Sequence, residues 1–272
     1  MSDSTEAKNE AHCDAGGAPA GGAGLPAKWL AALPVYNEVG YVDSVLDEVL
    51  KYAPHVLAVD DGSSDGTREI LEGRKDVAVV HHAKNQGYGA ALKTAFRYAI
   101  ERGYEILVTL DCDGQHQPMR VPDFARACTD VDIVSGSRYL QVFDGDSAPP
   151  EQRLTINKTI TKAINDLFGW QLTDTFCGFK AYRVESLKRL DISDNGYAMP
   201  LELWVQTAAL GLTVKELPVP LLYLDESRSF GGSLDNGAIR LAHYYQVIAR
   251  SLDDMRKKGY TVPDFDASNP VV

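Results

Sequence analysis

The stretch ILVTLDCDGQH, residues 106–116, joins a strand to a loop that is rich in oxygen ligands. Residues 106–110 form an apolar run of strand length, and Asp111 and Asp113 follow it directly. Because the chain leaves the strand at this point, both carboxylates can turn toward one place. A divalent cation held by only a few protein oxygens keeps coordination positions free for phosphate oxygens. The stretch therefore predicts a cation site suited to a nucleotide diphosphate.

Apolar runs alternate with amphipathic segments on both sides of this stretch. The pattern predicts strands at 29–33, 55–59, 77–81, 106–110 and 131–135, and helices at 38–52, 65–71, 89–102 and 121–128. Pro34 is expected to end the first strand. Such alternation is typical of an α/β protein whose parallel sheet is covered by helices, and ligands bind beyond the carboxyl ends of its strands. The polar loops 34–38, 60–67 and 111–116 each follow a predicted strand, so we expect them to converge on one edge of the sheet.

The regular alternation stops after Arg138. A loop is expected at 141–150, a helix at 156–167, strands of mixed direction at 177–182 and 214–224, and helices at 200–210 and 236–257. Residues 1–27 are rich in alanine, glycine, proline and acidic side chains, which predicts a disordered tail. The predicted organisation is this tail, a catalytic domain at 28–235, and a C-terminal helix and tail at 236–272.

The composition excludes several classes of protein. A formal net charge of −11 and a pI of about 5.0 argue against a nucleic-acid binder. The four cysteines show no paired spacing, which favours a reducing cytosolic setting. The N-terminal residues lack the pattern of a signal peptide, and no window approaches the roughly 18 apolar residues of a membrane-spanning helix. We therefore expect a cytoplasmic protein without a transmembrane helix, with peripheral contact at the inner face of the membrane left open.

The loop DDGSSDGT, residues 60–67, allows two interpretations. Its glycines permit tight turns, its hydroxyl side chains can cap the next helix, and a carboxylate here could accept hydrogen bonds from a base or ribose. The spacing of a twelve-residue calcium loop is also nearly matched, by Asp61, Ser63, Asp65, Gly66 and Glu72. A strand rather than a helix precedes the loop, and Arg68 stands where an apolar residue normally packs, which weighs against calcium.

Three motifs occur in a characteristic order: PVYNE at 34–38, DDGSSDGT at 60–67 and DCDGQH at 111–116. Together they resemble the inverting glycosyltransferases of family 2, and the resemblance extends from about residue 29 to 233. It implies a GT-A fold, which is a Rossmann-like arrangement with a mixed, mostly parallel central sheet flanked by helices. Further motifs resemble the polyprenyl-phosphate (dolichyl-phosphate) mannosyl- and glucosyltransferases, namely GSR at 136–138, DTFCGFK at 174–180, Glu202 and RSFGGS at 228–233.

The resemblance implies a role for each matching residue. The nucleoside pocket would be lined by Pro34, Tyr36, Glu38 and Asp61, and Asp111 would lie near the ribose and the diphosphate. Asp113 and Gln115 would ligate Mg²⁺ or Mn²⁺. The acceptor phosphate would contact Arg138, Arg153 and Asn157, and Arg228 would approach the same charged centre. Asp174 and Glu202 would face the sugar or the acceptor, so that the catalytic set is Asp113, Arg138, Asp174, Glu202 and Arg228.

The implied activity moves a hexose from GDP-mannose or UDP-glucose to a polyprenyl phosphate. One alternative is a soluble family 2 enzyme that glycosylates a hydroxyl group of a saccharide or small metabolite, with Asp174 or Glu202 as general base. A lipid phosphate is already ionised at neutral pH and needs cations instead of a base, which the three arginines would supply. A second alternative is a nucleotide- or calcium-binding module without transfer activity.

Some of these residues also have a purely structural interpretation. Arg153 could be a solvated charge, Tyr36 could serve packing, and Glu202 could bind backbone amides at a helix start. The final helix, 236–257, is too polar to span a membrane, so both core packing and docking at the membrane interface fit its pattern. Phe176 and Cys177 stand where relatives often have a different pair, which leaves the acceptor open.

Overall fold

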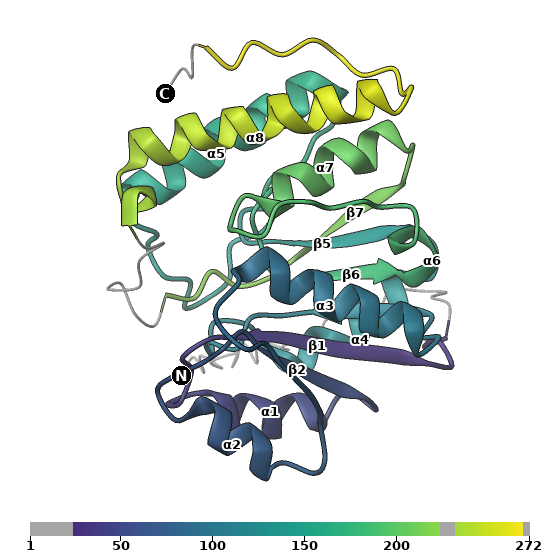
Figure 1. Ribbon diagram of the computed structural model, residues 1–272, viewed down its shortest axis with the longest axis vertical. Coiled ribbons are helices and arrows are strands. Elements are labelled where there is room, and N and C mark those ends of the chain that lie inside the picture. Colours follow the sequence, from purple (N-terminus) through teal and green to yellow (C-terminus); the bar gives the residue numbers. More distant parts are fainter. Residues whose placement is uncertain (1–23, 224–231, 269–272) are drawn as a thin grey trace, which may run out of the picture.

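A single seven-stranded sheet organises the protein, whose computed structural model describes residues 24–223 and 232–268 (Figure 1). The strand order is β3-β2-β1-β4-β6-β5-β7. The strands are β1 (Trp29–Val35), β2 (Val56–Asp60), β3 (Ala78–His81), β4 (Ile106–Thr109), β5 (Ile133–Ser137), β6 (Lys180–Arg183) and β7 (Val214–Pro218). Only β6 runs against its neighbours β4 and β5, and all other pairs are parallel. This confirms the expected mixed, mostly parallel sheet.

Helices cover both faces of the sheet because successive strand residues point to opposite sides. Ala31, Leu33 and Val35 of β1 pack with α1 (Val42–Leu50), α2 (Thr67–Gly73) and α4 (Val121–Ala127). Leu30 and Ala32 pack on the other face with α3 (Tyr88–Glu101) and α6 (Val184–Leu187). The two apolar layers keep β1, β2 and β4 buried and rigid beneath the loops that follow them.

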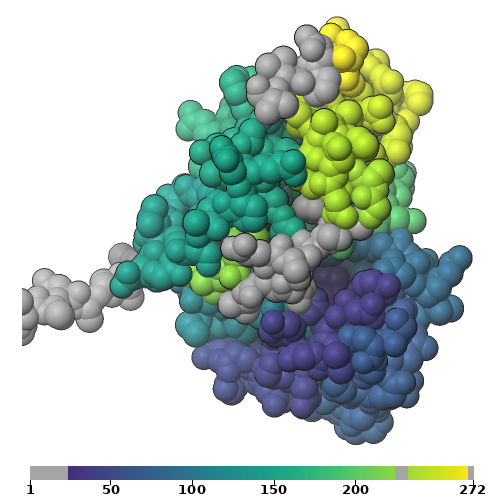
Figure 2. Space-filling model, turned by 90° about the vertical axis from the view of Figure 1, so that its left-hand side faces the viewer, coloured from purple at the N-terminus to yellow at the C-terminus, as the bar shows by residue number. Residues whose placement is uncertain are grey.

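A third apolar cluster joins α5 (Glu151–Phe168), α7 (Met199–Ala209) and α8 (Gly237–Lys257) at one end of the molecule. Trp204, Ile160 and Ile248 are fully buried in it. Figure 2 shows α5 in teal and α8 in yellow-green side by side, above the purple region that begins with β1. The final helix therefore packs into the body of the protein. Among the described helices, none has the length and apolar character needed to cross a bilayer.

Pro34 does not end the first strand as expected, because β1 continues to Val35. Ala31 and Val35 direct their backbone hydrogen bonds toward β2, whereas Ala32 accepts from Leu110 on the β4 side. Pro34 shares the β4 side with Ala32, but β4 pairs with β1 only as far as Ala32. The ladder between β1 and β4 therefore ends before it reaches the position of the N–H that Pro34 lacks.

The helix predicted from residue 38 begins at Val42 and the strand predicted from 177 begins at Lys180, and two further boundaries differ beside prolines. The helix predicted to begin at residue 156 begins at Glu151, directly after Pro149 and Pro150. The strand predicted to run to residue 224 ends at Pro218, and two residues later Pro220 stands on the wall of the large cavity. Helix α5 is therefore longer at its N-terminal end than predicted, and the segment that follows β7 is a loop that helps to line the cavity.

Candidate active site at the carboxyl edge of the sheet

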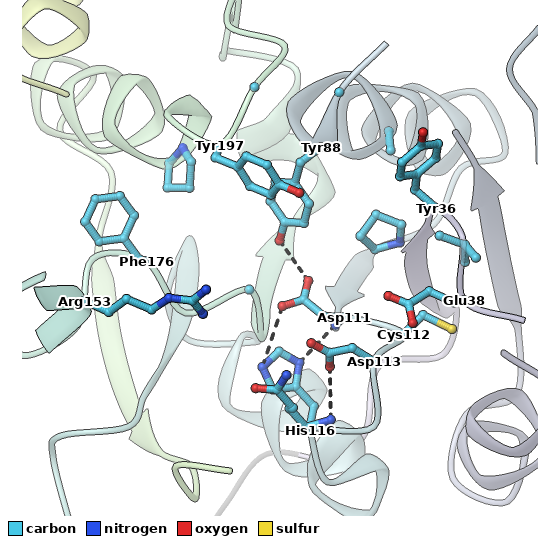
Figure 3. Close-up of a pocket in the computed structure, with 18 of the residues that line it drawn as sticks. Tyr36, Glu38, Tyr88, Asp111, Cys112, Asp113, His116, Arg153, Phe176 and Tyr197 are labelled. Atoms are coloured by element: carbon cyan, nitrogen blue, oxygen red, sulfur yellow. Dashed lines mark hydrogen bonds and ion pairs between the residues drawn. The ribbon is translucent and has the colours of Figure 1, made fainter. Parts of the chain in front are cut away.

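A cavity of about 860 Å³ lies at the carboxyl ends of the parallel strands (Figure 3). The loops that follow β1, β2 and β4 converge on it, as the sequence predicted, and the loop after β5 joins them. The predicted site residues on its wall are Pro34, Tyr36, Glu38, Asp61, Asp111, Asp113, Gln115, Arg138, Arg153 and Asn157. Asp174 and Glu202 are not on the wall, and Arg228 lies outside the described residues.

The loops after β1 and β2 are tied together by side-chain caps. Asn37 adopts a left-handed backbone with φ of 55°, which asparagine tolerates better than most residues. Its backbone N–H donates to Ser63 Oγ at 2.9 Å, and its Oδ1 accepts from the Ser64 N–H at 2.9 Å. Asp65 accepts from the N–H groups of Val39 and Thr67. The serines and Asp65 of the second motif therefore hold the first motif in place.

Asp61 is fixed by a separate set of donors. Its carboxylate accepts from the backbone N–H groups of Gln86 at 2.9 Å and Gly87 at 2.8 Å, and it lies 2.6 Å from His82 Nδ1. A carboxylate has roughly four acceptor positions, so one remains for a ligand. Asp61 and Asp65 bind different segments, and no group of three metal-ligating side chains occurs in the described part of the chain. Two carboxylates of the calcium-loop alternative are therefore used to hold neighbouring segments of the protein.

Neighbouring groups hold both members of the acidic pair after β4. Asp111 Oδ1 accepts from the Tyr88 hydroxyl at 3.0 Å, and its carboxylate fills the space where Gly178 lacks a side chain. A Cβ at Gly178 would come within 2.4 Å of Asp111 Oδ2. Asp113 Oδ1 accepts from the Gln115 backbone N–H at 3.0 Å. Figure 3 shows both carboxylates near the centre of the site, with Tyr36 and Glu38 on one side and Arg153 and Phe176 on the other.

His116 supports Asp111 from below. Its Nδ1 accepts from the Asp111 backbone N–H at 3.0 Å, which requires that nitrogen to carry no proton. The ring proton then lies on Nε2, which is 3.9 Å from Asp111 Oδ2. The imidazole therefore orients both the backbone and the carboxylate of Asp111.

The electrostatics of the pair suit a cation. Burial raises the pKa of the Asp111 carboxyl, and the nearby charge of Asp113 adds to this rise. A positive ion between the two carboxylates and a phosphate would offset both the burial of the Asp111 charge and its repulsion by Asp113. Asp113 and Gln115, with Asp111 behind them, offer few ligands, so a bound Mg²⁺ or Mn²⁺ would take its remaining oxygens from the substrate.

Asp174 is fully buried and holds Arg138. Arg138 donates from Nε to Asp174 Oδ2 at 2.7 Å and from Nη2 to Oδ1 at 3.0 Å, while the Asn157 amide donates to Oδ1 at 2.9 Å. Burial alone would raise the pKa of the Asp174 carboxyl, but the Arg138 charge and these hydrogen bonds lower it to about 2. Asp174 thus places Arg138 on the cavity wall from behind.

Glu202 acts on the loop before α7. Its oxygens accept from the backbone N–H groups of Ser193 at 3.0 Å and Asp194 at 2.7 Å. That loop carries Tyr197, whose ring stacks on Tyr88 with centroids 5.7 Å apart. Glu202 therefore positions an aromatic wall of the cavity rather than lining it.

Several residues that line the cavity were not assigned from the sequence, namely Tyr88, Tyr197, Arg240 and Tyr244. His116 stands in a recognised motif, but it was given no role. Tyr88 could have been found, because it directly precedes the helix predicted at 89–102, in the connection that follows the strand predicted at 77–81 and so leads from the same edge. Tyr197 lies in a loop without a motif, and Arg240 lies in a helix whose pattern indicates packing. Only the tertiary structure brings them to the site.

Solved structures with this arrangement of sheet and helices are GT-A glycosyltransferases. Glucosyl-3-phosphoglycerate synthase from Mycobacterium tuberculosis, in complex with Mn²⁺, UDP and glucosyl-3-phosphoglycerate, superimposes with a TM-score of 0.60 at 20% identity over 87% of this chain and 81% of that one. Mannosyl-3-phosphoglycerate synthase from Rubrobacter xylanophilus gives 0.58 at 17% identity over 85% and 75%. The fold is therefore GT-A.

The sequence comparisons define the family. Residues 31–191 match the model of glycosyl transferase family 2, and the chain belongs to that family. It is 32% identical over 227 residues to the undecaprenyl-phosphate mannosyltransferase of Micrococcus luteus, which covers 79% of this chain and 93% of that protein. It is 30% identical over 230 residues to the polyprenol monophosphomannose synthase of Mycolicibacterium smegmatis, with coverages of 79% and 86%.

The close approach of Gly178 to Asp111 gives a first prediction. We expect Gly178→Ala to displace the Asp111 carboxylate and to lower kcat for glycosyl transfer by about 100-fold, because misplacement by an ångström is enough for such a loss. The melting temperature should change little. Gly73→Ala is the control, since no atom lies within 4 Å of the added carbon. Equal activity of the two variants would show that the position of Asp111 does not matter.

The buried ion pair gives a second prediction. Asp174→Asn should lower the free energy of unfolding by about 3–5 kcal/mol, because it leaves the Arg138 charge without its partner. The folded-state pKa of Asp174 lies below the ordinary 3.8, so the contribution of the pair is present above about pH 4 and lost as the pH falls toward 2. Urea denaturation of this variant and of Arg138→Gln/Asp174→Asn tests this, and the double variant should recover much of the loss. Abolished transfer at unchanged stability would instead indicate a general base.

Proposed function

We propose that this family 2 glycosyltransferase moves a hexose from a nucleotide sugar, GDP-mannose or UDP-glucose, to a polyprenyl phosphate, with inversion and with Mg²⁺ or Mn²⁺. The observation that carries the proposal is the separation of charge along one cavity. Asp111 and Asp113 lie at its centre, and Figure 3 shows Arg153 on the side away from Tyr36 and Glu38; Arg138 also lines the wall. The first pair suits a cation with a diphosphate, and the second suits another anion.

The nucleoside would bind at the end of the cavity formed by the loops after β1 and β2. Tyr36 is partly exposed there and offers a ring, while Asp61 retains one acceptor position for an N–H group of the base. The diphosphate would then extend toward Asp111 and Asp113. The hexose would then lie near the stacked rings of Tyr88 and Tyr197, between the acidic pair and Arg153.

The chemistry is a single displacement at the anomeric carbon. An oxygen of the acceptor phosphate forms the new bond as the bond to the nucleoside diphosphate breaks, and the configuration inverts. A bound divalent cation would neutralise the charge that grows on the leaving diphosphate. Asp113 and Gln115 would hold that cation. Tyr88 and His116 would keep Asp111 in a fixed position near it.

A phosphate acceptor agrees with the state of the two candidate bases. Asp174 is bound by Arg138 and Asn157, and Glu202 is bound by the loop before α7. A hydroxyl acceptor needs a positioned base, and neither residue is on the cavity wall. An ionised phosphate needs only cationic guidance, which Arg153 and the remaining amino group of Arg138 can give. The geometry therefore supports the phosphate better than the hydroxyl alternative.

The names of the relatives favour the same acceptor. An undecaprenyl-phosphate mannosyltransferase and a polyprenol monophosphomannose synthase match most of this chain. A dolichyl-phosphate hexose transferase of Haloferax volcanii is 32% identical over 189 residues. Because a polyprenyl chain resides in a bilayer, we expect the enzyme to act at a membrane surface through peripheral contact.

The cation site can be tested without turnover. We expect Mn²⁺ together with UDP or GDP to raise the melting temperature of the protein, since a ligand that binds only the folded state stabilises it. Asp113→Ala should remove the Mn²⁺-dependent part of the shift and abolish metal-dependent transfer. Asp123→Ala, which changes an exposed aspartate of α4 paired with Arg126, is the control. Full activity of Asp113→Ala, or of the wild type in EDTA, would refute the metal assignment.

The acceptor assignment makes a separate prediction. Arg153→Gln should raise the KM for a polyprenyl phosphate by about tenfold or more, because a hydrogen bond to a charged group is lost. The thermal shift produced by nucleotide and Mn²⁺ should remain. Arg126→Gln, an exposed arginine far from the cavity wall, serves as control. An unchanged KM in Arg153→Gln together with transfer to a hydroxyl compound would favour the alternative acceptor.

A further inference from the structure

The acceptor side of the cavity is completed by α8, a helix that lies beyond the segment matching the family model. That segment ends at residue 191, whereas α8 spans Gly237–Lys257. We propose that Arg240 and Tyr244 of α8, together with Phe176, form a subsite for the phosphate and the first isoprene unit of the acceptor. This inference rests on the proposed function and adds a specificity element to it.

The residues of α8 divide between two tasks. Leu241, Ile248 and Leu252 are buried in the cluster shared with α5 and α7. Arg240 and Tyr244 are also buried, at 3% and 2% exposure, and both line the cavity, although Tyr244 belongs to the same cluster as well. Their spacing of four residues places them one turn apart on the same side of the helix. One stripe of α8 therefore packs the helix, and a neighbouring stripe faces the ligand.

Arg240 is held in a fixed position at the start of α8. Its Nη1 donates to the Leu234 carbonyl at 2.7 Å, and its Nη2 donates to Gln152 Oε1 at 3.2 Å. Gln152 in turn packs against Gly237, where a Cβ would come within 2.6 Å of its side chain. The first turns of α5 and α8 are thus in direct contact, which brings Arg240 near Arg153, the residue after Gln152.

The two guanidinium groups make this end of the cavity favourable for an anion. Burial lowers the pKa of Arg240, and the charge of Arg153 lowers it further. Both side chains line the same cavity. A phosphate between them would reduce the cost of placing two like charges close together, and the planar forks match its oxygens.

An apolar wall adjoins these cations. Phe176 packs on Tyr244 with ring centroids 5.0 Å apart and an interplanar angle of 33°. Ile156 of α5 also lines the cavity, and Figure 3 shows Phe176 beside Arg153. A saccharide hydroxyl acceptor would need hydrogen-bonding groups at this place. A phosphate ester of a hydrocarbon presents charge to the arginines and methyl and methylene groups to the rings, which is the chemistry this wall fits.

The test measures acceptor binding to the full chain in the presence of Mn²⁺ and nucleoside diphosphate. Farnesyl phosphate and inorganic phosphate are the two probes, titrated by calorimetry. We expect Arg240→Gln to weaken both probes by about tenfold or more. Tyr244→Leu should weaken farnesyl phosphate severalfold and leave inorganic phosphate nearly unchanged, because it removes ring contacts but no charge.

Matched controls come from the same helix. Arg256→Gln changes an exposed arginine at the far end of α8, and Tyr245→Leu changes a buried tyrosine that packs on Phe265 instead of lining the cavity. Both should bind the probes as the wild type does. If Arg240→Gln does not fold, Arg240→Lys keeps the charge, loses the fork, and is expected to weaken both probes to a smaller extent.

The outcomes distinguish a failure of the α8 subsite from a failure of the proposed function. Wild-type binding of farnesyl phosphate with unchanged affinity in Arg240→Gln and Tyr244→Leu would overturn the role of α8 and leave the proposed function intact. A wild type that binds the nucleotide but neither binds nor glycosylates farnesyl phosphate would overturn both. Equal losses in Tyr244→Leu and Tyr245→Leu would reduce Tyr244 to a packing residue and also overturn the subsite.

Discussion

Two carboxylates at the end of a buried strand are the constraint on which the rest of this site depends. Asp111 and Asp113 repel each other, and burial makes the charge of Asp111 more costly. Tyr88, His116 and the bare backbone of Gly178 nevertheless hold Asp111 in one place. Such an arrangement favours a cation that also meets the oxygens of a ligand. The two apolar layers around β1, β2 and β4 give these groups a rigid base.

A second charged pair organises the other half of the cavity without lining it. Asp174 is buried and bound by Arg138 and Asn157, so its charge is used to place a guanidinium on the wall. Glu202 acts in a similar way on the loop that carries Tyr197. Both acids were assigned by resemblance to the sugar or acceptor, and their geometry gives them an indirect, positioning role. In this half of the site, negative charge lies behind the wall and positive charge lies on it.

The sequence predicted the succession of strands and helices well because apolar periodicity reports burial in a layered sheet. Its errors at Pro34 and at the start of α5 come from contacts between segments far apart in the sequence. Pro34 remains within β1 because the strand beside it has already ended, a fact of pairing and not of residue preference. Helix α5 starts earlier than its apolar stripe suggests because its first turn packs on α8, which lies about 85 residues later. Such contacts over long separations cannot be read from a local pattern.

By itself the sequence determined the α/β architecture, the edge at which the loops meet, the acidic pair and the membership of the family, since each depends on short motifs and on strand periodicity. The tertiary structure alone decided that Asp174 and Glu202 stay off the cavity wall and that Arg240 reaches it. Asp174 and Arg138 are 36 positions apart, and Arg240 is 88 positions from Gln152, yet each pair is joined by hydrogen bonds. Whether a charge faces a ligand or supports another side chain depends on such partners, and the packing of α5, α7 and α8 is what brings them together.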